Sequence, residues 1–228
     1  QEFCQSFKTK SNIFEDLQSL QSIFLFLFFQ FAKRKGVCYK HGHVSLGFNL
    51  GFNMANSQHN IDELKKTALA LRRLALKIIF QAGSGHPGGS LSATDLMTAL
   101  FFGGILSYDP NQPKDPKRDR FLLSKGHASG IYYSVLAKAG FISEDDLGDY
   151  RKINSGRFLS GHGHPKTPGI EIASGSLGQG LSVAHGIALG TRLGGFDSKV
   201  YVILGDGEIQ EGQIWEAAMS ASKFKTNN

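Results

Sequence analysis

One short segment constrains the fold of this chain more than any other: an unbroken apolar run that leads directly into a glycine turn. Residues 199–204 read KVYVIL, the turn Gly205-Asp206-Gly207 follows, and a helical pattern occupies 208–224. A run without polar alternation is typical of a strand buried on both faces, as in a parallel sheet. Because other helical patterns flank this run, we predict an α/β fold in which helices cover a parallel sheet.

Helical periodicity is clearest between residues 61 and 81, where apolar residues step by three and four along one face. These residues are Leu64, Ala68, Leu71, Ala75 and Ile78. The glycines of the sequence Gly83-Ser84-Gly85 end this helix. Weaker patterns predict a loop at 108–120, a strand at 121–123, and helices at 92–100, 128–139, from Ser143 and at 178–193.

The helix predicted over 178–193 carries small residues at every fourth position. These are Gly178, Ser182, Gly186 and Gly190. Small residues at this spacing leave room for another backbone, so we expect close packing against this face. His185, on the same helix, is interpreted as a packing residue.

Residues 1–53 differ in composition from the rest of the chain. They hold 10 of the 18 phenylalanines and both cysteines, Cys4 and Cys38. Their apolar run, 23–31, is shorter than the ~20 residues that cross a bilayer. Basic residues follow this run rather than precede it, unlike in a signal peptide. Since the first methionine is Met54, we interpret residues 1–53 as lying upstream of the true start. A targeting or membrane-anchoring extension and a structural extension are the alternatives.

Charge and cysteine content limit the function classes. The 25 basic and 19 acidic residues give a net charge of +6. The basic residues are dispersed, which speaks against a nucleic-acid-binding protein and suits an anionic small ligand. Beyond Cys38 there is no cysteine, so we expect no disulfide framework, no cysteine metal site and a reducing cytoplasmic location. The apolar run 23–31 is too short to cross a bilayer, so we expect no membrane partner.

Asp206 is the sharpest candidate for chemistry. Its place after the predicted strand puts a carboxylate at the carboxyl end of a parallel sheet, where open α/β folds bind ligands. Flanking glycines let backbone N–H groups approach an anion, and the following helix start favours phosphate. A carboxylate in this setting suits Mg²⁺. An ordinary strand–turn–helix junction is the simpler interpretation of the turn taken alone.

Histidines in glycine-rich turns are the second group of candidates. They lie in SGHPGG (84–89), KGH (125–127) and GHGHP (161–165). Histidine exchanges protons near neutral pH and donates hydrogen bonds to phosphate. A zinc site at the last turn is disfavoured because no cysteine accompanies it. The loop 174–180, SGSLGQG, opens a helix but does not fit the dinucleotide-binding pattern.

Four segments, in order, resemble transketolase. They are SGHPGG (84–89), PKDPKRDRFLLSKGHAS (113–129), TPGIEIASGSLGQG (167–180) and GDGEIQEGQIWEAA (205–218). The resemblance runs from residue 61 to the end and is nearest to the form whose cofactor-binding half is a separate N-terminal subunit. It makes 54–228 the thiamine diphosphate-binding domain, incomplete at its C-terminal end, and leaves 1–53 outside.

The resemblance implies thiamine diphosphate bound through Mg²⁺, with Ca²⁺ as a possible substitute. It implies transfer of a two-carbon ketol unit between phosphorylated sugars. By matching positions, Asp206 is a metal ligand and the Gly207 backbone meets the diphosphate. Gly175 and Leu177 match the loop that holds the aminopyrimidine.

The resemblance also assigns catalytic residues. His86 and His127 match histidines that line the diphosphate and the reaction centre. Glu211 matches a glutamate in the carboxylate network between the active sites of a dimer. A further histidine contacts substrate hydroxyls; an ungapped match makes it His162, which we favour, and keeping the His-Pro pair makes it His164.

Two parts of the family site lie outside this sequence. The metal motif closes with an Asn in a D-x-N-G element after another strand, and the activating glutamate belongs to a pyrimidine-binding domain. We therefore expect this chain alone to be inactive and to need that domain, from downstream sequence or a C-terminal subunit, in a homodimer or heterotetramer. A dihydroxyacetone synthase, a deoxyxylulose-phosphate synthase and a non-catalytic paralogue are the alternatives.

Overall fold

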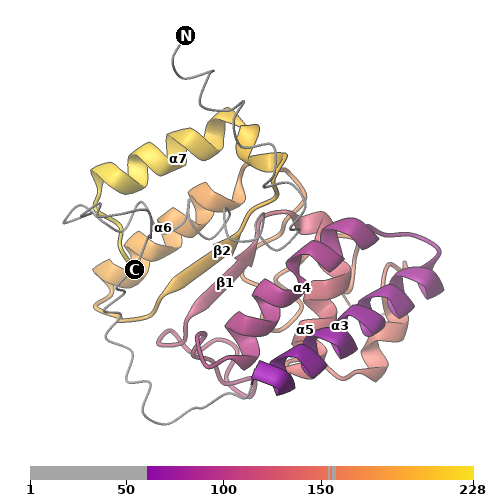
Figure 1. Cartoon of the computed structure of the whole chain (residues 1–228). Coiled ribbons are helices and arrows are strands. Elements are labelled where there is room, and N and C mark those ends of the chain that lie inside the picture. Colours follow the sequence, from indigo (N-terminus) through magenta and orange to yellow (C-terminus); the bar gives the residue numbers. More distant parts are fainter. Residues whose placement is uncertain (1–60, 154, 156–157) are drawn as a thin grey trace, which may run out of the picture. The chain divides into compact units, whose positions relative to one another are not determined.

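A computed structural model describes residues 61–153, 155 and 158–228 (Figure 1). The predictions for residues 1–53 fall outside the described residues. The regular elements of the described residues are α3 (Ile61–Ala82), α4 (Pro87–Phe102), β1 (Arg120–Leu123), α5 (Ser129–Lys138), α6 (Gly180–Leu193), β2 (Val200–Ile203) and α7 (Gly212–Lys223). Three short 3₁₀ helices join them: η2 (Gly126–Ala128), η3 (Asp145–Asp149) and η4 (Glu208–Gln210).

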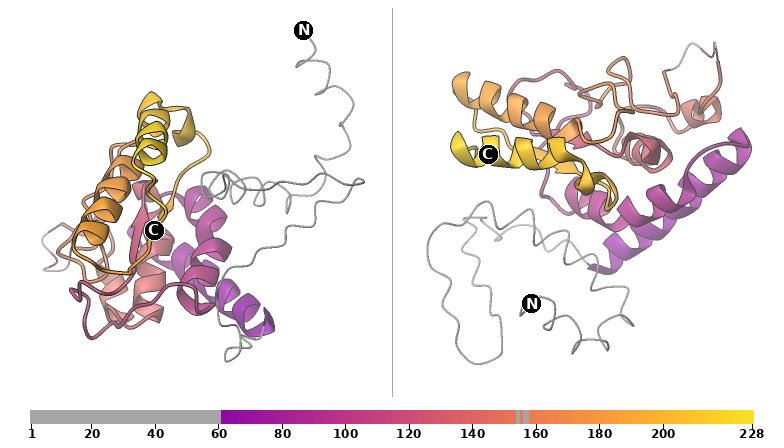
Figure 2. Two further views of the ribbon diagram at one scale, coloured as in Figure 1. Left: turned by 90° about the vertical axis from the view of Figure 1, so that its left-hand side faces the viewer. Right: turned by 90° about the horizontal axis from the view of Figure 1, so that it is seen from above.

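The two described strands form a parallel pair with helices on both faces. β1 pairs with β2 in a register that sets Arg120 opposite Val200 and Leu123 opposite Ile203. Helices α3, α4 and α5 lie on one side of this pair, and α6 and α7 lie on the other (Figure 1, Figure 2). The predicted α/β fold with a parallel sheet is confirmed.

Alternation along the strands divides the core into two clusters. Phe121 and Leu123 of β1 point into the cluster built by α3, α4 and α5. Leu122 of β1 and Val202 of β2 point the other way and pack with Ala184 of α6. Because successive side chains of a strand face opposite sides, helices are needed on both faces to keep this short apolar pair from water.

The predicted apolar face of α3 is confirmed. Ala68, Leu71, Ala75 and Ile78 are buried. Helix α3 packs against α4 and α5 through this face. It ends at Ala82, where Gly83 adopts a φ of +60°, a backbone conformation that favours glycine.

Three predicted helix boundaries are wrong. Helix α4 begins at Pro87, not at Ser92, because proline at the first helical position loses no hydrogen bond. The helix expected from Ser143 is only the 3₁₀ turn η3. The helix expected over 208–224 is interrupted at Glu211, whose extended backbone separates η4 from α7.

The prediction of close packing along the small-residue stripe of α6 is also wrong for most of its length. A Cβ added to Gly186 or Gly190 would meet no atom within 4 Å. Within the stripe, Gly178 has a close neighbour, because its added Cβ would lie 3.0 Å from the Glu211 Cβ. Gly180, which lies outside the stripe, is tighter: an added Cβ there would collide with the Ser124 side chain and lie 2.8 Å from the Ser124 Cα. His185 packs between α6 and α7 as expected, with its Nε2 3.1 Å from the Ser220 hydroxyl.

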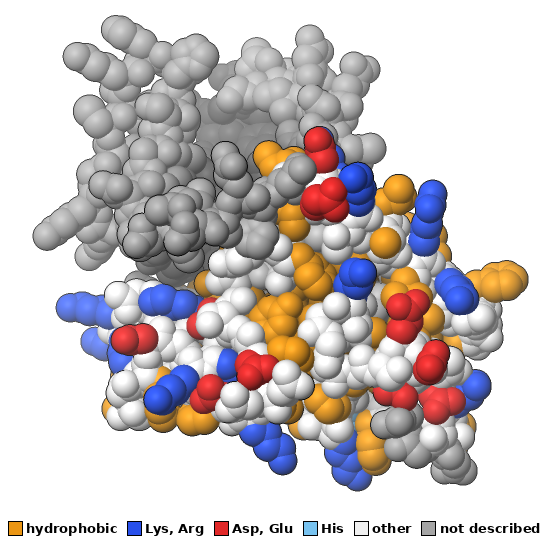
Figure 3. Space-filling model, turned by 90° about the horizontal axis from the view of Figure 1, so that it is seen from below, with side chains coloured by type: hydrophobic (Ala, Val, Ile, Leu, Met, Phe, Trp, Pro, Cys, Tyr) orange, Lys and Arg blue, Asp and Glu red, His pale blue; other side chains and the backbone are white. Residues whose placement is uncertain are grey.

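The face of the molecule seen in Figure 3 carries basic and acidic side chains side by side, with apolar side chains between them. The dispersed charges of the sequence therefore do not gather into a patch of one sign on that face. Within the part of the chain that the structure describes, none of the helices combines the length and apolar character that a bilayer crossing requires.

The two kinds of glycine on α6 give a first test. Gly180→Ala is expected to lower the free energy of unfolding by about 1–3 kcal/mol, because the Ser124 backbone cannot rotate away from the new methyl group. Gly186→Ala, the matched control on the same helix, is expected to raise it by about 0.5–1 kcal/mol through lower chain entropy. Urea denaturation of both variants measures the difference. Equal effects of the two substitutions would contradict the packing described.

Candidate functional site

Three segments meet at the carboxyl ends of β1 and β2. Residues 124–127 follow β1, residues 205–208 follow β2, and the loop 174–180 leads into α6. Parallel strands end at the same edge of a sheet, so the first two segments are neighbours by topology. The third is brought in by Gly180, which contacts Ser124.

A buried carboxylate joins all three segments. Glu208 is 4% exposed. Its Oε1 accepts hydrogen bonds from the Ser124 hydroxyl and from the backbone N–H of Gly178, the latter at 2.9 Å. Its Oε2 accepts from the backbone N–H of Gly205 at 2.8 Å. The sequence analysis assigned no role to Glu208. The only feature of the sequence that could have pointed to it is its acidic side chain directly after the Gly-Asp-Gly turn.

Asp206 and Gly207 lie exposed at the apex of the turn, between Gly205 and Glu208, which are joined by the last of these hydrogen bonds. A Cβ added to Gly207 would meet nothing within 4 Å, so the backbone there is open to a ligand. The ammonium of the buried Lys125 interacts electrostatically with Asp206 and with Glu208. Burial lowers the pKa of Lys125, and these two carboxylates oppose that shift. Its Nζ donates to the Ser92 hydroxyl at 2.8 Å.

This donor set fits a metal-bound diphosphate. Across residues 61–153, 155 and 158–228, no group of three or more His, Cys, Asp or Glu side chains could hold a metal ion. Asp206 thus offers a single carboxylate. Mg²⁺ is commonly bound by one or two carboxylates together with substrate phosphates and water, and an open glycine backbone with a nearby ammonium suits the phosphates.

The structure brings two of the predicted histidines into contact. His86 lies at the start of α4 and His127 lies in η2. Their ring centroids are 5.2 Å apart in an edge-to-face arrangement. Burial lowers the pKa of His127, and the neighbouring His86 and Lys125 lower it further. Such surroundings favour the neutral imidazole, which has one nitrogen that donates and one that accepts.

The two candidates in the third histidine turn have different surroundings. The ring of His162 lies 3.5 Å from the position of a Cβ added to Gly175. Burial lowers the pKa of His162, and Arg151 and His86 add to that effect. His162 therefore shares an electrostatic environment with the other site histidines.

His164 instead belongs to its own turn. Its ring stacks on Phe158 with centroids 5.5 Å apart, and its Nδ1 accepts from the backbone N–H of Lys166 at 3.1 Å. The Lys166 ammonium lies 4.2 Å from the centroid of the same Phe158 ring. These contacts hold His164 within its own turn, whereas His162 lies beside Gly175 of the loop 174–180.

The remaining predicted residues lie along the loop 174–180 and its neighbour. Gly175 has a φ of +141°, which favours glycine, and Leu177 is 40% exposed. A Cβ added to Gly178 would lie 3.0 Å from the Cβ of Glu211. Glu211 is exposed, and although it precedes α7 its side chain makes no capping hydrogen bond.

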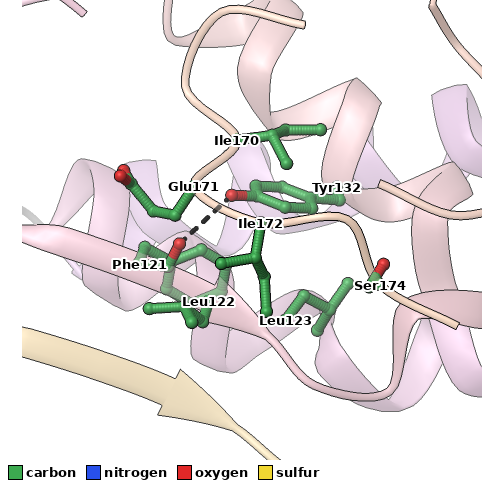
Figure 4. Close-up of a pocket in the computed structure, with 8 residues that line it drawn as sticks. All are labelled: Phe121, Leu122, Leu123, Tyr132, Ile170, Glu171, Ile172 and Ser174. Atoms are coloured by element: carbon green, nitrogen blue, oxygen red, sulfur yellow. Dashed lines mark hydrogen bonds between the residues drawn. The ribbon is translucent and has the colours of Figure 1, made fainter. Parts of the chain in front are cut away.

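A small cavity lies beneath the segment that leads into this loop (Figure 4). Its volume of about 10 Å³ leaves room for one water molecule at most. The Tyr132 hydroxyl has one proton, which it can donate to the Gly169 carbonyl at 3.0 Å or to the Phe121 carbonyl at 3.3 Å. Burial raises the pKa of Glu171 in the cavity wall, and its partner Arg118 opposes that shift. These contacts support the loop rather than bind a substrate.

Comparison with known proteins gives consistent matches. Residues 63–228 match the profile of a family described as transketolase, thiamine diphosphate binding domain. The chain is 45% identical to human transketolase over 174 residues, which is 75% of this chain and 27% of the human protein. It is 43% identical to one subunit of the apulose-4-phosphate transketolase of Actinobacillus succinogenes over 173 residues, which is 73% of this chain and 60% of that subunit.

A solved structure gives the same result. Transketolase from Campylobacter jejuni superimposes with a TM-score of 0.70 and 37% identity, covering 74% of this chain and 27% of that one. The chain therefore spans about a quarter of the length of the single-chain relatives and somewhat more than half of the bacterial subunit.

The histidine pair predicts a specific pH response. The pKa of His127 is expected to lie below its usual 6.5. The unfolded chain then binds more protons between the folded pKa and 6.5, so this residue makes the folded chain less stable as the pH falls through that window. Titration of the histidine Cε1 protons by NMR measures the pKa. His86→Asn removes one cause and is expected to raise the pKa of His127; no change, or a fall, would contradict the arrangement.

Proposed function

Because this chain belongs to the transketolase family through its thiamine diphosphate-binding domain, we propose that it binds thiamine diphosphate with Mg²⁺ and serves a ketol-transferring enzyme. In this proposal residues 54–228 form the diphosphate-binding domain and residues 1–53 lie outside it. The reaction is transfer of a two-carbon unit between phosphorylated sugars. When bound, thiamine diphosphate supplies the carbanion-stabilising chemistry that amino acid side chains lack.

The observation that carries the proposal is that the Gly205–Gly207 turn lies against Lys125 at the carboxyl edge of the strands, where a Cβ added to Gly205 would lie 3.5 Å from the Lys125 Cβ. Asp206 would hold Mg²⁺, and the open backbone at Gly207 would donate to the diphosphate. Lys125 would add a positive charge from within the fold. Gly175 and Leu177 would support the aminopyrimidine from the loop that Gly180 anchors on Ser124.

The histidines would move protons at the substrate. His86 and His127 lie in contact, and the lowered pKa of His127 favours a neutral ring near pH 7. A neutral ring accepts a proton from one sugar hydroxyl or donates one to another oxygen. His162 would contact further hydroxyls, in preference to His164, whose ring is stacked on Phe158.

A partner would complete the enzyme. The relative from Actinobacillus succinogenes is, by its name, one subunit of a transketolase, which supports a separate subunit that supplies the pyrimidine-binding domain. Glu211, exposed and not used to cap α7, would reach a carboxylate network across the dimer. A homodimer or heterotetramer in the cytoplasm, acting on sugar phosphates, completes the proposal.

The single tryptophan provides a direct test of cofactor binding. Trp215 is half exposed on α7, and its indole N–H donates to the Ile209 carbonyl at 2.9 Å, close to the Asp206–Gly207 turn. We expect thiamine diphosphate to quench its fluorescence only when Mg²⁺ is present. Asp206→Asn is expected to weaken this binding at least tenfold, because it removes the carboxylate charge from the metal.

The control for this titration is Asp197→Asn, which changes an aspartate near the amino end of β2, at the opposite end of the strand from the site, and is expected to leave binding unchanged. Titrations run with and without a transketolase C-terminal half separate a weak site from one that needs its partner. Wild-type affinity in Asp206→Asn, or quenching that does not depend on Mg²⁺, would refute the proposal.

A further inference from the structure

We propose that Glu208 is a positioning residue that fixes the loop 174–180 against the Gly205–Gly207 turn. Its effect on a cofactor rests on the proposed function, because these two segments would hold the aminopyrimidine and diphosphate ends of one molecule. Its effect on the loops themselves rests only on the contacts in the structure.

The contacts of Glu208 are long-range rather than a turn motif. Gly178, which donates to its Oε1, lies 30 residues earlier in the sequence, and Ser124 lies 84 residues earlier. Only the bond from Gly205, three residues earlier, is local. A residue needed only to close the turn would need only that last bond.

Burial makes these bonds strong. Removing a carboxylate from water is costly unless hydrogen bonds and an opposite charge compensate it. Three donors and the electrostatic attraction of Lys125 meet that requirement in a side chain that is only 4% exposed. Hydrogen bonds to an ionised acceptor are roughly twice as strong as those between neutral groups.

The three hydrogen bonds to Glu208 also determine which residues face a ligand. The bond between Gly205 and Glu208 closes the turn at its base and leaves Asp206 and Gly207 at the exposed apex. The bond from Gly178 fixes the residue next to Leu177 on the facing loop. The carboxylate of Glu208 thus sets the separation between Leu177 and Gly207. A ligand of fixed length that touches both would bind best at one separation.

The test uses Glu208→Gln, which keeps the shape of the side chain but replaces one acceptor oxygen with an NH₂ group. At least one of the two glycine N–H groups then loses its partner. Hydrogen exchange of the Gly178 and Gly205 amides is measured in the whole chain. We expect at least a tenfold faster exchange at one or both, and roughly a tenfold rise in the dissociation constant of thiamine diphosphate with Mg²⁺.

The matched control is Glu216→Gln, which makes the same charge change at an exposed position of α7 and should leave both readouts unchanged. If Glu208→Gln does not fold, Ser124→Ala takes its place. It removes one donor and is expected to produce smaller shifts in the same direction. Exchange that rises evenly along β1 and β2 would indicate general destabilisation and would overturn the proposal.

Two further results separate the proposals. Faster exchange at the glycines with an unchanged dissociation constant would overturn the positioning role, because the hydrogen bonds to Glu208 would then serve stability alone. If the wild-type chain, supplied with its partner half, binds no thiamine diphosphate, the proposed function fails. The exchange difference between Glu208→Gln and Glu216→Gln then decides by itself whether Glu208 fixes the loops.

Discussion

A carboxylate buried beneath a glycine turn must find donors within the fold, and in this chain that need ties the whole candidate site together. Glu208 finds one donor after β1, one in the loop before α6 and one in its own turn. The strands bring only two of these segments to the same edge, and each strand has only four residues. The third segment is held by this carboxylate and by the steric contact between Gly180 and Ser124. The Glu208 carboxylate and the close packing of Gly180 therefore both fix the loop 174–180 at Ser124.

The placement of the histidines follows from where helices begin. Helix α4 starts at Pro87, so His86 is the residue that directly precedes the helix, and its ring meets that of His127. The apolar pattern alone placed this start at Ser92, because Gly88 and Gly89 add nothing to a hydrophobic periodicity. A Cβ added to Gly89 would lie 3.1 Å from the His127 ring, so the lack of a side chain there makes room for the histidine pair.

The sequence predicted helices and strands where burial requires apolar residues in a regular pattern. It did not predict contacts that are made by the backbone. The face of α3 and the parallel strand β2 were predicted because apolar side chains mark them directly. The prediction from the small-residue stripe of α6 was wrong because spacing shows which residues share a face but not what packs there. Nothing meets Gly186, whereas Gly180, outside the stripe, is tight. Glu208 went unnoticed because two of its donors are peptide N–H groups of glycines, which no residue pattern records.

The charges of the site explain why a cation should accompany a diphosphate. Lys125 contributes one positive charge, and the carboxylates of Asp206 and Glu208 contribute two negative charges that interact with it. The two carboxylates outnumber the one ammonium, so these three groups alone would repel an anion. The buried Glu208 carboxylate is needed to fix the loops, so its negative charge stays in the site. The second negative charge, that of Asp206, lies at the exposed apex of the turn. In the proposed function, a divalent cation held by Asp206 would reverse the local sign, and the turn that would otherwise repel a diphosphate would then attract it.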